Sequence, residues 1–115
     1  MAKNIAVIIR HSPLNTIRSV EAFRLGIGLT LEGNRVDLFL MENGAWNALS
    51  ISPNSLQRPD VDQFIQSMEL CGVKGYVDSM ELPPTYQLQI RKEFQIRSKE
   101  EMFRIIRQAD VVIPF

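Results

Sequence analysis

The feature that most constrains the fold is a strand–helix–strand pattern at the start of the chain. Residues 4–9, NIAVII, are continuously apolar and rich in β-branched side chains, which is typical of a central parallel strand covered on both faces. Residues 35–41, RVDLFLM, form a second such run, and a helical period fills the interval from about Leu14 to Glu32. Two buried strands joined by a helix make a right-handed parallel crossover unit, so the sequence predicts an α/β fold.

The helix predicted at 14–32 carries apolar side chains on more than one side. Its main apolar face consists of Ile17, Val20, Phe23, Ile27 and Leu31. Leu25 and Leu29 add a second flank, while Arg18, Glu21 and Arg24 hold the polar side. A sheet can cover only one of the two apolar flanks, so we expect the other to contact another subunit.

The remainder of the chain repeats the alternation of helix and strand. It is predicted to contain, in order, a helix at 60–70 ended by Gly72, a strand at 73–77, a short helix within 79–92, a short strand at 93–97, a helix from the Ser98–Glu101 capping box to about 108, and a last strand at 109–115. The whole chain, 1–115, is therefore predicted to be a single three-layer α/β domain. Its mainly parallel sheet has about five strands, with helices on both faces.

Residues 42–59 show no sustained periodicity and are predicted to be a long connecting loop. Loops of this length in small domains are usually functional, interfacial or mobile. Trp46 lies within it, and two roles are open: the indole anchors the loop to the body of the domain, or it contacts a partner.

Composition narrows the range of functions. Thirteen basic residues balance thirteen acidic ones, so no net charge favours nucleic acid or an anionic membrane. No apolar run approaches the roughly 20 residues of a membrane span, and the start of the chain lacks a signal-peptide cleavage site. One cysteine and one histidine form neither a disulfide nor a zinc site, and no metal or cofactor is expected. A reducing cytoplasm is the expected location.

Polar side chains gather where the predicted parallel strands end, which is where open α/β sheets bind ligands. Arg10, His11 and Ser12 follow the first strand, and Asp78 and Ser79 follow the third. We expect all five to line the solvent-open end of the sheet. A helix N-terminus beside a basic side chain could hold an anion. In the alternative, Ser12 is a simple helix cap, and Arg10 and His11 are solvated.

Known catalytic signatures do not account for this edge. The chain has no Walker A motif, and the glycines of LGIG lie within a helix instead of after a strand. One histidine with scattered serines and aspartates does not define a catalytic triad.

The single cysteine, Cys71, lies at the predicted end of a helix, just before Gly72. The negative end of the helix dipole disfavours a thiolate, and reactive thiols are usually found near helix N-termini and basic groups. The strand that follows separates Cys71 from the carboxyl-end face by roughly 16 Å. We therefore expect Cys71 to be a buried structural residue that fills space in the core.

Four segments, in this order, resemble the DsrE/DsrF family of sulfur-relay proteins. They are KNIAVIIRHSP, LEGNRVDLFLMENGAW, CGVKGYVDSMEL and IIRQADVVIPF, and together they span nearly the whole chain. The resemblance implies a compact α/β fold, assembly into trimers or hexamers, and transfer of persulfide sulfur between partner proteins.

One position departs from the thiol-bearing members of that family. Those members carry a cysteine just after the third strand, following a segment like Gly72-Val73. The matching position here is about Asp78, and Cys71 stands seven residues earlier. In this respect the chain resembles the DsrF and TusC types, which lack the cysteine and serve as structural subunits.

The resemblance therefore implies an accessory or binding subunit that is not itself an enzyme. Its expected partners are copies of itself in a homo-oligomer, related subunits in a hetero-oligomer, and sulfur-carrier proteins. Two alternatives are a sulfurtransferase that uses Cys71 as persulfide acceptor, and an oligomeric module that binds a small ligand or anion at Arg10, His11, Ser12, Asp78 and Ser79.

Overall fold

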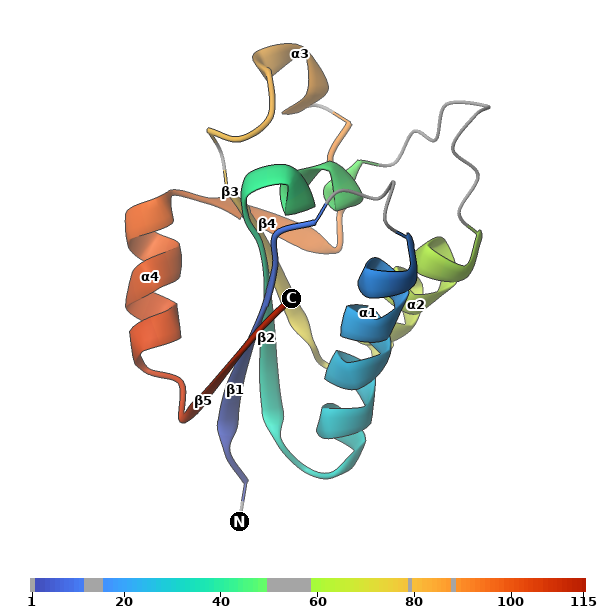
Figure 1. Cartoon of the computed structure of the whole chain (residues 1–115), viewed down its shortest axis with the longest axis vertical. Coiled ribbons are helices and arrows are strands. Elements are labelled where there is room, and N and C mark those ends of the chain that lie inside the picture. The colour runs from blue at the N-terminus through green and yellow to red at the C-terminus, as the bar shows by residue number, and fades with distance from the viewer. Residues whose placement is uncertain (1, 12–15, 50–58, 79, 88) are drawn as a thin grey trace.

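The computed structural model contains one sheet of five parallel strands in the order β4-β3-β2-β1-β5 (Figure 1). It describes residues 2–11, 16–49, 59–78, 80–87 and 89–115. The strands are β1 (Asn4–Ile9), β2 (Arg35–Leu40), β3 (Lys74–Asp78), β4 (Phe94–Arg97) and β5 (Val111–Pro114). Four of these strands fall within the segments that predicted them, and β3 is shifted by one residue from the predicted 73–77 to end at Asp78.

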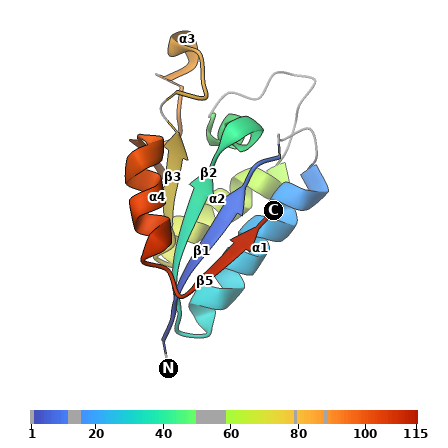
Figure 2. The ribbon, with the colours of Figure 1, turned by 60° about the vertical axis from the view of Figure 1, so that its left-hand side comes forward.

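Helices cover both faces of this sheet, which confirms the predicted three-layer α/β architecture. The helices α1 (Thr16–Leu31) and α2 (Pro59–Leu70) lie on one face, and α4 (Lys99–Arg107) lies on the other (Figures 1 and 2). A short 3₁₀ helix, η1 (Glu42–Ala48), and the one-turn helix α3 (Pro84–Gln87) stand beyond the carboxyl ends of the strands. Within the described ranges, no helix is both long and apolar enough to cross a bilayer.

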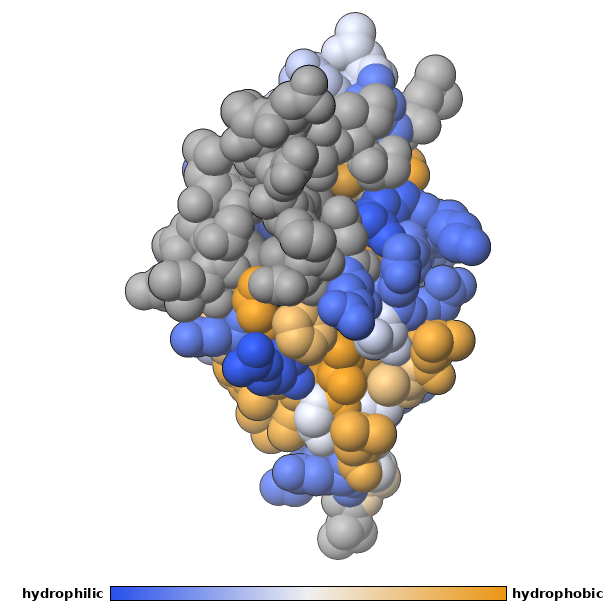
Figure 3. Space-filling view, turned by 90° about the vertical axis from the view of Figure 1, so that its right-hand side faces the viewer, coloured by the Kyte–Doolittle hydropathy of each residue, from blue (hydrophilic) through white to orange (hydrophobic). Residues whose placement is uncertain are grey.

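The larger part of the core lies between the sheet and the α1/α2 pair. Alternate residues of each strand point to this side of the sheet. Along the central strands these residues are apolar, and Val7, Leu38 and Val77 are almost inaccessible to solvent. Phe23 of α1 and Ile65 and Met68 of α2 close it from above. On the outer surface of the two helices, hydrophobic side chains still gather between polar ones (Figure 3).

A smaller cluster lies between the sheet and α4. It consists of Ala6, Phe39, Met41, Tyr76 and Met102. Phe39 and Tyr76 stack with ring centroids 5.3 Å apart and planes inclined by 18°. Asp37, two residues before Phe39 on β2, faces the same side because strand side chains alternate.

Local sequence signals set the helix ends as expected. The backbone N–H of Glu101 donates to Ser98 Oγ at 3.2 Å, so the predicted cap begins α4. Gly72 ends α2 with a φ of 83°, a left-handed conformation that glycine adopts at little cost.

Two predictions about helices need correction or fall outside the described residues. Leu31 was assigned to the core face of the first helix, but it is the last helical residue and is 77% exposed. The predicted start at Leu14 lies outside the described residues, as do the side chains of Ile17 and Arg18.

The predicted loop at 42–59 is structured in its first part. Residues 42–48 form η1, because Gly44, Ala45 and Ala48 are small enough to sit buried against the end of the sheet. A Cβ on Gly44 would collide with the carbonyl group of Ile9, so only glycine fits there. Residues 50–58 lie outside the described part of the chain.

The structure places Trp46 against the body of the domain. Its ring meets Tyr86 of α3 edge to face, with centroids 5.3 Å apart. An isolated bridge between Leu49 and Ile90, and a 2.7 Å hydrogen bond from the N–H of Arg91 to the carbonyl of Ala48, tie the two connecting segments together. This geometry corresponds to the anchoring role considered for Trp46.

Candidate functional site

The carboxyl edge of the sheet brings Arg10, His11 and Asp78 to one end of the molecule. Arg10 and His11 follow β1, and Asp78 is the last residue of β3. Because β2 pairs with both strands, the two segments share an edge without being neighbours. Ser12 and Ser79, the other two residues expected here, lie outside the described residues.

The side chain of Asp78 is buried instead of lining an open end, so this part of the prediction is wrong. The residue is only 1% exposed. Its Oδ1 accepts a hydrogen bond of 2.9 Å from the backbone N–H of Met80, which turns the chain over the carboxylate. Its Oδ2 is buried, and no described residue donates a hydrogen bond to it.

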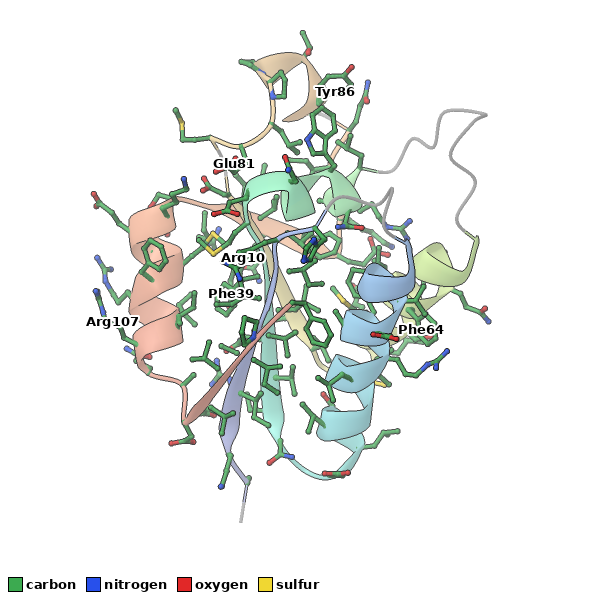
Figure 4. All side chains as sticks on the ribbon, in the orientation of Figure 1. Arg10, Phe39, Phe64, Glu81, Tyr86 and Arg107 are labelled. Carbon is green, nitrogen blue, oxygen red and sulfur yellow. The ribbon has the colours of Figure 1, made fainter. Side chains whose placement is uncertain are left out.

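The side chain of Lys99 lies beside this buried carboxylate. Its Nζ lies 3.8 Å from Asp78 Oδ2 and 3.0 Å from Glu81 Oε1. The hydrogen bond to Glu81 and the charges of Glu81 and Asp78 raise the pKa of Lys99 above its ordinary value. Glu81 lies at the carboxyl edge near the start of α4 (Figure 4).

The sequence contained a signal for Lys99 that the prediction did not use. The capping box at Ser98 makes Lys99 the first residue of a helix that begins where β4 ends. A helix that starts after a parallel strand starts at the carboxyl edge, which places Lys99 beside Asp78.

Glu42 is a second residue at this edge that the sequence prediction missed. It follows β2 with a φ of 52°, an uncommon left-handed conformation for a residue with a side chain. Its charge also acts to raise the pKa of Lys99, as the smallest of the contributions. The carboxylates of Asp78, Glu81 and Glu42 thus all favour the charged form of Lys99.

Arg10 and His11 are held by their backbones. The N–H of Arg10 donates to the carbonyl of Phe115 at 3.0 Å, which continues the β1–β5 ladder. Asn47 is fully buried, and its Nδ2 donates at 3.0 Å both to the carbonyl of His11 and to that of Gly44. The exposed side chain of Arg10 lies on the α4 side of the sheet (Figure 4).

Cys71 lies at the opposite, amino edge of the sheet, as predicted. Its backbone N–H donates to the carbonyl of Ser67 at 3.0 Å, in the last turn of α2. The prediction that the residue is buried is wrong, because Cys71 is partly exposed. The chain leaves the helix at this point through the exposed Gly72, so one side of the thiol is left uncovered.

A second buried carboxylate, Asp37, lies under α4 in the middle of the sheet. The residue is 8% exposed, and no described residue donates a hydrogen bond to its Oδ1. Burial raises the pKa of Asp37, although the charges of Arg35, with Nε 3.9 Å from Oδ2, and of Lys74 oppose the rise. Burial and the charge of Asp37 also raise the pKa of Tyr76.

Two surface hollows with described linings lie away from the carboxyl edge. One, of about 520 Å³, is lined by Gln66, Glu69, Leu70, Arg91, Lys92 and Glu93. The other, of about 350 Å³, runs along α1. Among the residues that the structure describes, no group of three or more histidine, cysteine or acidic side chains is arranged to hold a metal ion.

These features define a single-domain α/β protein with a parallel sheet, in which the carboxylate of Asp78 is buried at the carboxyl edge and faces Lys99. The chain matches the DsrE/DsrF-like family over residues 3–115 and belongs to that family. A search of curated proteins found no match. Among solved structures it is similar to the YchN protein from E. coli, with a TM-score of 0.76, 19% sequence identity and full coverage of both chains. At that identity the similarity shows a shared fold.

Proposed function

We propose that this chain is a non-catalytic accessory subunit of a sulfur-relay system, which binds partner subunits and does not itself carry sulfur. Family membership supports a role related to sulfur relay in general. The more specific role rests on what occupies the end of β3, the position that carries the sulfur-accepting cysteine in thiol-bearing relatives.

The observation that carries the proposal is the state of Asp78. A carboxylate cannot form a persulfide, since it has no sulfur atom to bond to a transferred one. One oxygen of Asp78 accepts from the N–H of Met80, and the other faces Lys99 from a fully buried position. At this position the chain therefore has a buried carboxylate that faces Lys99, where a relay protein would need an accessible thiol.

Cys71 is the only thiol that could replace the missing one, and it is poorly placed to do so. It lies at the other edge of the sheet, at the C-terminal end of α2, far from the position that carries the thiol in thiol-bearing relatives. Its partial exposure nevertheless makes sulfur transfer through Cys71 the second candidate function.

A sulfur-loading assay separates these two candidates. The folded protein is incubated with a cysteine desulfurase and cysteine, and the intact mass is measured without reductant, beside a thiol-bearing family member as positive control. We expect no gain in mass on incubation, either for the native protein or for the Cys71→Ser control variant. Loading of the native protein that is lost in Cys71→Ser would overturn the accessory role.

The partner-binding half of the proposal needs its own test. The tagged protein is expressed together with related subunits from the same cell, and the purified complex is measured by native mass spectrometry. We expect an assembly that survives Cys71→Ser unchanged, because binding does not depend on the thiol. Isolation of this chain without any related subunit or second copy would contradict it.

A further inference from the structure

The outer side of the edge strand β4 presents backbone groups to its surroundings. In the described sheet, β4 pairs with β3 alone. The N–H of Phe94 donates to the carbonyl of Arg91 at 3.1 Å, so it is not used in the ladder with β3. Backbone groups of alternate residues point to the same side of a strand, and Ile96 therefore also directs its N–H and C=O to the outer side.

The side chain of Arg97 supplies a donor that a neighbouring strand would otherwise supply at this edge. Its Nη1 donates to the carbonyl of Ile96 at 2.8 Å, and its Nη2 donates to Gln95 Oε1 at 2.7 Å. Inside a sheet, such a carbonyl accepts from the backbone N–H of the next strand. The guanidinium therefore occupies the place where an N–H of an added strand would bind.

On the α2 side, a hollow at the start of β4 and two exposed apolar side chains accompany this edge. The hollow, of about 520 Å³, lies between the end of α2 and residues 91–93, which lead into β4. Leu70 is the last residue of α2, lines the hollow and is 89% exposed. Ile96 faces the same side as the buried Phe94, because strand side chains alternate, and is 40% exposed. This side of the edge therefore suits apolar side chains of an added strand.

On the α4 side, the edge is polar and carries a cation. Gln95 and Arg97 face this side, and Arg97 Nε lies 3.6 Å from Glu101 Oε2 of α4. An added strand that takes the carbonyl of Ile96 releases one N–H group of the guanidinium, which then needs another acceptor. A carboxylate on the added strand provides that acceptor in a charge-assisted hydrogen bond. Lys92, exposed beside the hollow, is a second cation near the start of the strand.

We propose that β4 is a docking edge for an extended segment of a partner protein, which adds to the sheet as a further strand. The segment alternates acidic side chains, directed to Arg97 on the α4 side, with apolar side chains, directed to Ile96 and Leu70 on the α2 side. In contacts of this kind, main-chain hydrogen bonds supply affinity and the alternate side chains supply specificity. The docking goes beyond the accessory role, because it needs neither a thiol nor a related subunit.

A short peptide with this alternation tests the docking edge directly. The probe is acetyl-Glu-Val-Glu-Val-Glu-Val-amide, which is added to the native chain labelled with nitrogen-15. We expect chemical-shift changes confined to residues 66–70 and 91–97, and slower amide exchange at Ile96, because its N–H becomes hydrogen-bonded. The control acetyl-Glu-Glu-Glu-Val-Val-Val-amide has the same composition without the alternation, and it should bind at least about tenfold more weakly.

N-methylation separates backbone recognition from unspecific apolar binding. One peptide is methylated on the backbone nitrogen of its valines, and another on that of its glutamates. In an added strand, alternate N–H groups face β4 and the others face solvent, so one methylated peptide should lose binding and the other should retain it. The same result for both methylated peptides, or no binding of the unmethylated probe at about 1 mM, would overturn the proposal.

Variants of the chain locate the contact. Ile96→Pro removes the outward N–H and leaves the ladder with β3 in place, so we expect a folded chain that does not bind the probe. Leu70→Glu changes an exposed side chain at the hollow and should weaken binding about tenfold. Leu31→Glu is its matched control, because Leu31 is also the last residue of a helix, is 77% exposed and belongs to α1. Circular dichroism confirms that each variant is folded. Equal weakening by Leu31→Glu and Leu70→Glu would overturn the assignment to this edge.

Charge reversal tests the acidic half of the pattern. Arg97→Glu should prefer acetyl-Lys-Val-Lys-Val-Lys-Val-amide to the glutamate probe, the reverse of the native preference, and an unchanged preference would contradict the proposed pattern. A second copy of the chain is the other candidate occupant. It would protect the amide of Ile96 without peptide and more strongly at higher protein concentration, a result that would also overturn the proposal. Sulfur loading does not use this edge, so the accessory role and the strand addition can fail separately.

Discussion

The two faces of the sheet are built on different principles. Under α1 and α2 the central strands present only apolar side chains, such as Val7, Leu38 and Val77. On the α4 side two of the same strands bury carboxylates, Asp37 and Asp78, in addition to a small apolar cluster. One face has two helices of 16 and 12 residues over it, whereas the other has a single helix of 9.

We infer that the two faces contribute differently to the stability of the domain. Apolar burial is non-directional and adds with area, so the α1/α2 face can supply most of the stability of the domain. A buried carboxylate without a full set of hydrogen bonds costs free energy, so the α4 face is less stable for its size. Groups with that cost are commonly retained where a protein binds, switches or reacts.

The strongest test uses two adjacent residues of β2, Leu38 and Asp37, whose side chains point to opposite faces of the sheet. In each variant, the apolar or acidic residue is replaced by one of the other kind. Leu38→Asp removes an apolar side chain, worth about 2–5 kcal/mol, and places an unpaired charge in the apolar face at a cost of several more. Because a domain of this size is stable by about 5–15 kcal/mol, we expect this variant to be largely unfolded in urea-free buffer, as measured by circular dichroism.

The reciprocal change, Asp37→Val, is the matched control on the α4 face. It replaces an incompletely bonded carboxylate with a β-branched side chain, so we expect a result between no change and about 2 kcal/mol of added stability. If the two variants lost similar amounts of stability, the two faces would not differ as described.

The architecture was predictable because it follows from periodicity. The apolar runs at NIAVII and RVDLFL each became a central strand, and the capping box at Ser98 began α4 as expected. The prediction was wrong where small residues let two backbone segments pack closely, because such packing leaves no periodic pattern in the sequence. Residues 42–48 became a buried 3₁₀ helix because Gly44 admits the carbonyl of Ile9, which pattern analysis does not detect.

The candidate site was less predictable than the fold, since it depends on which way single side chains turn. Sequence placed Asp78 at the correct edge, but its burial depends on the turn through Met80 and on Lys99, which is 21 residues away. In the same way, the position of Cys71 at the end of a helix was predictable. Its exposure depends on how the turn through Gly72 leaves the helix.

The second prediction concerns the single helix of the α4 face. Ser98→Ala removes the hydrogen bond that caps α4, and a lost cap costs about 1 kcal/mol. A helix of 9 residues is too short to be stable alone, so we expect α4 to loosen before the rest of the domain. Amide hydrogen exchange should speed up in α4 with little change in β2. Equal acceleration in α1 would contradict the independence of the two faces.

The third prediction concerns α1, a helix of the other face, and here we expect the substitution to increase the stability of the domain. Gly28→Ala places a methyl group in free space on α1 and reduces the flexibility of the unfolded chain, which should add about 0.5–1 kcal/mol. The expected readout is a higher urea midpoint with an unchanged slope. Gly44→Ala is the contrasting control, because its Cβ would meet the carbonyl of Ile9 and destabilise the domain. A lower midpoint for Gly28→Ala would show that Gly28 serves the monomer itself.

The smallest expected effect is the pH dependence contributed by Asp37, because the charges of Arg35 and Lys74 offset part of the effect of its burial. Its pKa in the folded chain lies above the ordinary value of about 3.9, so the native state binds the proton first as the pH falls. Stability from this group therefore rises as the pH falls through the folded pKa, and levels off below the ordinary value.

Asp37→Asn does not titrate and measures this contribution by difference. We expect the variant to be more stable than the native chain at pH 7, and this advantage to shrink as the pH approaches 4. Glu93 provides the opposite case, because its pKa is lowered in the folded chain. Burial acts to raise its pKa, but the hydrogen bonds from Arg91 and from the backbone of Glu93, together with the charges of Arg91 and Lys92, lower it overall. Glu93→Gln should therefore be less stable at pH 7, with a deficit that shrinks in acid. Urea unfolding of the three proteins from pH 7 to pH 4 measures both trends. An advantage of Asp37→Asn that grew in acid would mean that the α4 face stabilises its buried carboxylate as an anion.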